Sequence, residues 1–277
     1  MNNKFLYLIF SLNCFAFSAQ AVELCGTVRQ GEILVGKAAP GEEVTFNDKR
    51  IATTADGRFL LAFGRDEINN QKLRVTGALG GSASYEFAVA PGEWDIQNIT
   101  GVPPRKVTPS DSDLEAIQLE GKVVGAALKE LGDNPAWTSG FIRPVEGRIS
   151  GKFGGQRIMN KVPKSPHRGM DIAAKEGTPV KAAADGKITL AYPDLFYSGN
   201  TVIIDHGFGL QTIYAHLKDM NVKRGDTVKQ GDIIGSVGKT GRVTGPHLHW
   251  GASLRDVRFN PQSLLDMNKN QEKCFTL

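Results

Sequence analysis

The chain has 277 residues, of which 40% are hydrophobic and 22% charged, and its formal net charge is +4. These values are ordinary for a folded globular protein with one large or two moderate domains. The charge is small and no basic run is interleaved with aromatic residues, so the sequence gives no reason to expect nucleic-acid binding.

Residues 1–21 have the three parts of a signal peptide. Lys4 makes the start basic, residues 5–17 are mostly apolar, and Ala19-Gln20-Ala21 fits the small-x-small cleavage rule. We therefore expect cleavage after Ala21 and a protein that is periplasmic or secreted. A retained membrane anchor is the alternative, but the apolar run is short and contains polar residues, and no other stretch is long enough to span a bilayer.

Two cysteines remain after removal of the signal peptide, Cys25 and Cys274. An even number of cysteines in an exported protein favours a disulfide. This bond would tie the N-terminal segment to the C-terminal tail and keep the domains together. Two free or intermolecular thiols are the alternative.

Residues 22–102 read as short strands broken by turns, with Asn47-Asp48 near one turn and residues 59–63 as a buried-type strand. This regular spacing of short strands predicts a small β-sandwich, immunoglobulin-like in outline. The segment has no histidine and no catalytic constellation. It could be a binding module, a cover over a site in the other domain or a docking surface for a partner, and a spacer or regulatory module is the expected role.

Residues 103–135 read as a Pro-rich boundary followed by a connector helix. Residues 110–113 suit a helix start, with acids in the first turn, and the pattern ends near Gly132. The predicted apolar stripe consists of Leu114, Ile117, Leu119, Val123, Val124, Ala127, Leu128 and Leu131. Packing of this stripe on one of the domains is favoured over a partner-binding helix.

Residues 136–268 return to a β pattern, with Asp185-Gly186 at a turn between two strands, and residues 269–277 form a C-terminal tail. Many antiparallel strands and few helices predict a compact β-domain with loops over a groove. The predicted fold is therefore all-β with two domains: the β-sandwich, the helical connector and a C-terminal antiparallel sheet.

All five histidines of the chain lie in this last domain, at His167, His206, His216, His247 and His249. Because side chains alternate along a strand, His247 and His249 point to the same side. Asp171 follows His167 by four residues. Two imidazoles and a carboxylate suit zinc, and three protein ligands leave a fourth position for water, as in catalytic sites.

The order His-x-x-x-Asp, then a lone His-Leu, then Gly-Pro-His-x-His resembles the lysostaphin-type (LytM-like) zinc endopeptidases that cut peptidoglycan cross-links. The similarity covers about residues 140–262, including the stretches 199–207 and 235–241. The resemblance implies that His167, Asp171 and His249 bind one Zn²⁺ per chain. It makes His247 the general base, and His216 the residue that orients the water or stabilises the oxyanion.

The resemblance gives no metal role to His206, which we expect to be structural, in the turn after a strand. The predicted groove would be lined by residues 154–166, 192–200 and 238–246. Asn200, Tyr214 and Arg242 are candidates for substrate contact, each equally compatible with a structural role.

The expected function is an exported zinc metallo-endopeptidase that acts on peptidoglycan peptide stems as a monomer. The resemblance implies the D-alanyl–meso-diaminopimelate bond as its target. A glycyl-glycine endopeptidase acting on bridge peptides or proteins is the main alternative. Two further alternatives are a non-catalytic amidase activator, which would typically lack zinc ligands, and a wall-binding module with a structural metal.

Overall fold

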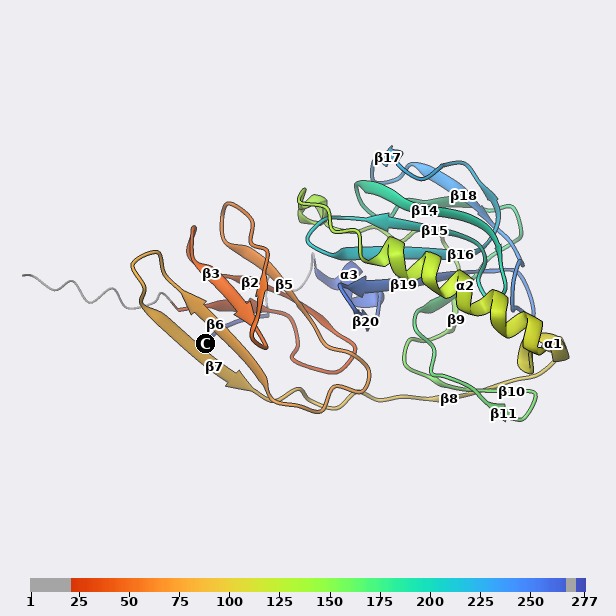
Figure 1. The fold of residues 1–277 in the computed structure, drawn as a ribbon, viewed down its shortest axis with the longest axis horizontal. Helices are drawn as coiled ribbons and strands as arrows, with labels where there is room; N and C mark the ends of the chain where they lie inside the picture. Colours follow the sequence, from red (N-terminus) through yellow and green to blue (C-terminus); the bar gives the residue numbers. More distant parts are fainter. Residues whose placement is uncertain (1–20, 268–272) are drawn as a thin grey trace, which may run out of the picture.

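The computed structural model describes residues 21–267 and 273–277. The expected signal peptide therefore lies outside the described residues, apart from Ala21. Within the described ranges, no helix is long and apolar enough to cross a membrane. Figure 1 shows a smaller N-terminal body of strands beside a larger C-terminal body, so the predicted two-domain, nearly all-β architecture is confirmed.

The N-terminal body consists of two four-stranded antiparallel sheets, counted over the described residues. The first has the order β21 (Cys274–Thr276), β1 (Glu23–Cys25), β2 (Ile33–Lys37) and β5 (Arg58–Ala62). The second has the order β4 (Lys49–Ile51), β3 (Glu43–Phe46), β6 (Gln71–Thr76) and β7 (Ser82–Phe87). Asn47 and Asp48 both have positive φ in the tight β3–β4 turn, a conformation that these residue types tolerate.

Strands β2 and β5 bury both of their faces, because successive side chains point to opposite sides. Leu34 and Leu61 pack in the core between the two N-terminal sheets. Ile33 and Leu60 point the other way and pack in the core of the C-terminal body. The two bodies are therefore joined by an apolar contact that is continuous with the core of the C-terminal body.

The last described strand, β21, completes the first N-terminal sheet by pairing antiparallel with β1. Cys25 and Cys274 lie opposite each other in this pair and are joined by the predicted disulfide. The sequence treated residues 269–277 as a tail, whereas residues 274–276 form a strand of the N-terminal sheet (Figure 1).

The segment between the two bodies contains β8 (Ile96–Ile99), α1 (Pro104–Val107) and α2 (Asp111–Leu128). Strand β8 pairs in parallel with β10 (Gln156–Met159), which also pairs with β11 (Val162–Pro163). The sequence pattern placed residues 96–99 in the N-terminal domain, but their strand partner belongs to the C-terminal body. Figure 1 shows β8 running along this body on the way to the helices.

Helix α2 begins with a capping box: the Ser110 hydroxyl accepts from the Asp113 N–H, and the Asp113 carboxylate accepts from the Ser110 N–H. Its last turns pack Val124, Ala127 and Leu128 on the sheet. The predicted stripe was too long, because Leu114, Leu119 and Leu131 are exposed. Contact with the sheet, rather than helical spacing alone, decides which apolar side chains are buried.

The C-terminal body is built on a sheet of ten strands within the described residues. Its main path is β17 (Thr227–Val228), β14 (Gly186–Leu195), β15 (Gly199–Asp205), β16 (Leu210–Met220), β19 (His247–Leu254), β12 (Met170–Ala173) and β9 (Arg148–Gly151). The remaining elements are β13 (Pro179–Lys181), β18 (Ile233–Val237), β20 (Val257–Phe259), the 3₁₀ turn η1 (Ala136–Ser139) and α3 (Gln262–Met267).

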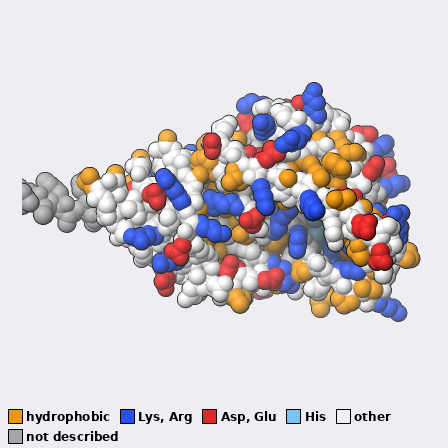
Figure 2. Space-filling model, viewed as in Figure 1, with side chains coloured by type: hydrophobic (Ala, Val, Ile, Leu, Met, Phe, Trp, Pro, Cys, Tyr) orange, Lys and Arg blue, Asp and Glu red, His pale blue; other side chains and the backbone are white. Residues whose placement is uncertain are grey.

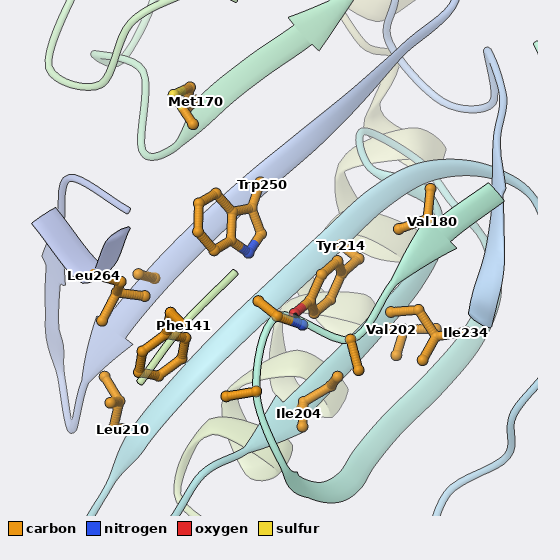
Figure 3. Packing of buried hydrophobic residues seen from close by; sticks show 14 of the residues in the cluster. Phe141, Met170, Val180, Val202, Ile204, Leu210, Tyr214, Ile234, Trp250 and Leu264 are labelled. Carbon is orange, nitrogen blue, oxygen red and sulfur yellow. Dashed lines mark hydrogen bonds between the residues drawn. The ribbon is translucent and has the colours of Figure 1, made fainter. Parts of the chain in front are cut away.

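Two large aromatic side chains fill the centre of this body (Figure 3). Tyr214 of β16 and Trp250 of β19 lie opposite each other in the strand pair and are fully buried. The Tyr214 hydroxyl accepts a hydrogen bond from the Ala183 N–H at 2.9 Å, which satisfies its buried oxygen. This rigid core lies directly beneath the strands that carry the histidines.

Candidate metal centre

Two of the predicted metal ligands are directly opposite each other on neighbouring strands. Asp171 of β12 pairs with His249 of β19 in the antiparallel register. Cross-strand partners point to the same face, so the pairing itself brings the carboxylate and the imidazole together. His249 Nδ1 lies 2.9 Å from Asp171 Oδ1.

The third predicted ligand, His167, comes from the loop before β12 and is fixed by backbone contacts. Its Nδ1–H donates to the Lys152 carbonyl at 2.9 Å, and its main-chain N–H donates to the Gly155 carbonyl at 2.9 Å. A carbonyl can only accept, so the proton of the neutral ring is on Nδ1 and Nε2 carries a lone pair. That Nε2 lies 3.0 Å from Asp171 Oδ1 and 3.0 Å from His249 Nδ1.

The three candidate ligand atoms therefore form a compact triangle that fits a metal ion. Their separations of 2.9–3.0 Å are close to the roughly 3.3 Å between ligand atoms around tetrahedral zinc. Two imidazole nitrogens and one carboxylate oxygen are also a donor set that zinc accepts. The residues present thus fit zinc in both donor type and spacing.

The two predicted catalytic histidines stand beside this triangle. His247 Nε2 is 3.7 Å from Asp171 Oδ1, and the His216 and His247 ring centres are 4.8 Å apart. The Nδ1–H of His247 donates to the Gly245 carbonyl at 2.9 Å, and that of His216 donates to the Thr240 carbonyl at 2.8 Å. Each neutral ring therefore keeps its Nε2 as an acceptor.

His216 occupies a strained position in the sheet. Its φ is +64°, a left-handed conformation that costs a non-glycine residue about 1 kcal/mol. Strand β16 pairs with β19 as far as Ala215 and with β18 from Leu217 onward. His216 lies at this change of partner, and the irregular backbone there turns its ring toward the other histidines.

The protonation states of the cluster suit metal binding. Burial raises the pKa of Asp171, but hydrogen bonds and charge from His167 and His249 outweigh it and hold the pKa of this carboxyl well below its usual range. Burial lowers the pKa of His249 to about 4. Burial, together with His247 and His249, lowers the pKa of His216 well below its usual value. Metal ligands must be deprotonated, and the directions of the Asp171 and His249 shifts favour that state.

Arg157 of β10 is a site residue that the sequence did not single out. Its guanidinium forms an ion pair with Asp171 Oδ2, which leaves Oδ1 for the triangle, and both side chains are largely buried. Gly151 and Gly169 leave room for this arrangement, since an added Cβ would lie 2.6 Å from Asp171 Oδ2 or 2.7 Å from the His249 ring. Arg157 lies ten residues before His167, within a range expected to line the groove.

A cavity of about 360 Å³ opens onto the cluster and is lined by Asp171, His216 and His247. Residues from two of the three ranges expected to line the groove contribute to it, Arg157 and Met159 from 154–166, and Arg242, Val243 and Thr244 from 238–246. None of its lining residues falls within 192–200. Its remaining wall includes Gln97, Asn98 and Ile99 of β8, which the sequence assigned elsewhere.

Two of the three candidates for substrate contact have structural positions. Tyr214 is fully buried in the core, so it cannot touch a ligand in the cavity. The Asn200 side chain accepts from the Asp194 N–H and donates to the Lys218 carbonyl, both at 3.0 Å. Arg242 alone of the three lines the cavity.

His206 lies outside the cluster, as expected. It follows β15 and is fully buried, with Nδ1–H donating to the Asp185 carbonyl at 2.7 Å and Nε2 accepting from the Thr212 hydroxyl at 2.7 Å. Both ring nitrogens are satisfied, and burial lowers the pKa of the ring to about 4.

Comparison with known proteins places the chain among peptidases. Residues 165–261 match the model of peptidase family M23. The DD-carboxypeptidase/endopeptidase Mpg of Neisseria meningitidis is 48% identical over 98 residues, which are 35% of this chain and 22% of Mpg. The peptidoglycan DD-endopeptidase ShyA of Vibrio cholerae is 37% identical over 158 residues, 52% of this chain and 36% of ShyA.

A crystal structure from Pseudomonas aeruginosa, described as a candidate M23 peptidase, covers 88% of this chain and 97% of its own, with a TM-score of 0.68 and 29% identity. The similarity to this structure extends over both bodies, whereas the chain spans well under half the length of Mpg and ShyA. The C-terminal part of the chain is therefore a peptidase M23 domain of the lysostaphin (LytM) type, the family that its histidine motifs indicated.

Proposed function

We propose that the protein is an exported zinc metallo-endopeptidase that hydrolyses peptide cross-links of bacterial peptidoglycan. The observation that carries this proposal is the triangle of ligand atoms from His167, Asp171 and His249, with two further histidines beside it and a cavity in front. A structural zinc site is normally closed by four protein ligands, whereas three ligands beside an open cavity suit catalysis.

The proposed ligands are His167 Nε2, Asp171 Oδ1 and His249 Nδ1, binding one Zn²⁺ per chain. Zinc in this position would acidify a water molecule and polarise the scissile carbonyl. The Lys152 carbonyl holds the tautomer of His167, and Arg157 holds the second oxygen of Asp171. Such supporting contacts orient the ligands, and their loss typically weakens metal binding.

His247 is the proposed general base. Its Nε2 carries the free lone pair, because its Nδ1–H is committed to the Gly245 carbonyl. It would accept the proton of the attacking water and deliver it to the leaving amine. His216 Nε2 is likewise an acceptor, so the neutral ring can orient the water but has no proton for an oxyanion. The hydrogen bond to Thr240 thus favours the water-orienting role of the two that the resemblance left open.

The proposed bond is the D-alanyl–meso-diaminopimelate cross-link. ShyA and ShyC are named peptidoglycan DD-endopeptidases and Mpg a DD-carboxypeptidase/endopeptidase, and these relatives support that class over a glycyl-glycine peptidase. Export through the signal peptide at residues 1–21 and action as a monomer belong to the same proposal. An amidase activator is disfavoured because none of the five motif residues is missing.

The test is digestion of purified cross-linked peptidoglycan by the mature protein, with muropeptides read by mass spectrometry. We expect loss of cross-linked dimers, which a chelator stops and zinc restores, and the fragment masses identify the bond. Intact dimers after incubation with zinc-saturated protein would contradict the proposal. Cleavage only within glycine bridges would move the target to the alternative bond.

A further inference from the structure

We propose that Arg242 binds the substrate carboxylate that lies next to the scissile amide nitrogen, and so selects the cross-link that is cut. This inference deepens the proposed function and rests on it. It assigns to the loop before β19 a recognition role that is separate from the chemistry of the histidines.

The first support is that Arg242 is a partly buried cation without an acidic partner. Burial lowers its pKa, the nearby cation Arg157 lowers it further, and Tyr197 offsets part of this decrease. Among the described residues, no carboxylate forms an ion pair with Arg242. A desolvated cation of this kind is costly unless an anion or a strong acceptor pairs with it, and here the partner can come from the cavity.

The second support is that the Arg242 guanidinium is pre-positioned. It lies over the Tyr197 ring, 4.2 Å from its centre, and the Arg242 N–H donates to the Tyr197 carbonyl at 2.8 Å. Gly241 permits this close packing, because its φ is +77° and an added Cβ would lie 2.5 Å from the Tyr197 carbonyl oxygen. Stacking on an aromatic face leaves the edge of the guanidinium free to donate two parallel hydrogen bonds.

The third support is the charge around the cavity. Arg157 and Arg242 both line it, against the single carboxylate of Asp171. Arg157 is already committed to Asp171, so Arg242 is the cation that remains available. A bound metal ion would add further positive charge. Figure 2 shows Lys and Arg side chains over the middle of the face in view, with a few Asp and Glu side chains among them.

The chemistry of the proposed substrate supplies the anion. In a D-alanyl–meso-diaminopimelate cross-link, the carbon that bears the scissile amide nitrogen also bears a free carboxylate. An internal glycyl-glycine bond has no such group. A guanidinium near the histidine cluster can therefore distinguish the two bonds by pairing with this carboxylate, since a site built for a charged partner rejects substrates that lack it.

The test uses two synthetic cross-linked peptides that differ in one group. In one peptide the carboxyl next to the scissile amide is free, and in the other it is a carboxamide. The zinc-saturated full-length mature protein should prefer the free carboxylate by about 10- to 100-fold in kcat/KM, the usual effect of one charge-assisted hydrogen-bonded pair. Arg242→Gln should lose activity on the carboxylate peptide only, which brings the ratio near one.

Arg242→Lys keeps the charge without the fork geometry and should fall between the two. Lys239→Gln is the matched control, because it removes a cation of the same loop that pairs with Glu176 outside the cavity, and it should keep the wild-type ratio. The ratio separates recognition from a merely structural role, which would lower both activities alike. Equal rates of the wild type on both peptides, or an unchanged ratio in Arg242→Gln, would overturn the inference while the proposed function stands.

Failure of the proposed function has a different signature, because the wild type would then cleave neither peptide. Binding of the same two peptides, measured by titration calorimetry, then decides about Arg242 without catalysis. Weaker binding of the carboxamide, abolished by Arg242→Gln, supports the role. Equal binding of both peptides refutes it. Arg242→Lys gives the same readout if the glutamine variant does not fold.

Discussion

Histidines lie at both ends of the sheet region formed by β12, β15, β16 and β19, and the two ends differ in how the ring nitrogens are used. At one end, both nitrogens of His206 are hydrogen bonded within the protein. At the other end, His167, His216 and His247 each give only Nδ1 to a backbone carbonyl. The Nε2 atoms of His167 and His247 lie 3.0 Å and 3.7 Å from Asp171 Oδ1. The end with the proposed site is therefore the one where each of these imidazoles uses one nitrogen in a hydrogen bond to the backbone and keeps the other available.

The largest expected effect comes from substitution of Asp171, the carboxylate among the proposed metal ligands. Asp171→Asn removes the carboxylate charge that faces both His167 and His249 and should reduce both bound zinc and endopeptidase activity to background. The fold should survive, because Asn is isosteric and the sheet core is intact. Zinc content by mass spectrometry and muropeptide release measure the two effects. Asp185→Asn, which alters a surface pair with Lys229, is the control and should retain zinc and activity.

A second prediction separates the base from the ligands. His247→Ala should retain zinc, since none of the proposed ligand atoms is lost, while kcat falls about 10²- to 10⁴-fold, the usual contribution of a positioned base. Metal content and initial rates on isolated muropeptide dimers check this outcome. Full activity in the variant would remove His247 from the mechanism.

Changes at His206, where both ring nitrogens are hydrogen bonded, should alter the free energy of unfolding and not catalysis. Burial lowers the pKa of His206 to about 4 from an ordinary value near 6.5, so the unfolded chain takes up the proton first as pH falls. The free energy of unfolding should therefore be highest above about pH 6.5 and decline between pH 6.5 and 4, by about 3 kcal/mol from this residue.

His206→Gln should remove that part of the decline, because glutamine does not titrate but can still donate to Asp185 and accept from Thr212. Urea unfolding of the two proteins at a series of pH values gives the difference. Activity at neutral pH should stay within a few-fold of the wild type. If the two stability curves run parallel through this pH window, His206 is not the titrating group.

The smallest effect is expected for Arg157, which contacts the proposed ligand Asp171 but is not itself a ligand. Arg157→Lys keeps a cation near Asp171 but loses the fixed geometry of the guanidinium, so zinc affinity should fall about 10- to 100-fold, as is usual for supporting contacts. Saturating zinc should restore most of the activity. Competition with a chromogenic chelator gives the affinity, and an unaltered affinity would show that Asp171 needs no second partner.

Sequence patterns predicted the parts of the site that depend on local geometry. The two-residue spacing of His247 and His249 required only that they lie on a strand, and β19 begins at His247. The disulfide followed from counting two cysteines. By contrast, the parallel pairing of β8 with β10 joins segments about 60 residues apart, and no short pattern encodes such a register. Arg157 and the β8 wall of the cavity were missed for this reason.

Burial was also predictable only in part. The apolar run at residues 59–63 indicated a buried strand, but that Leu60 and Leu61 belong to different cores depends on how the two bodies pack. The same dependence on packing explains helix α2. The helical pattern was correct, but it predicted more buried residues than the contact with the sheet buries. The left-handed backbone of His216 has no sequence signal, since non-glycine residues adopt it only where the surrounding sheet imposes it.

Strand β21 has a consequence for how the protein is made. The first sheet of the N-terminal body lacks an edge strand until Cys274–Thr276 pairs with β1, after all the other described strands have been synthesised. Closing a contact across 249 residues is slow compared with hairpin formation. Completion of this sheet should therefore be a late step in folding, and loss of residues 273–277 would damage a sheet whose other strands are synthesised much earlier.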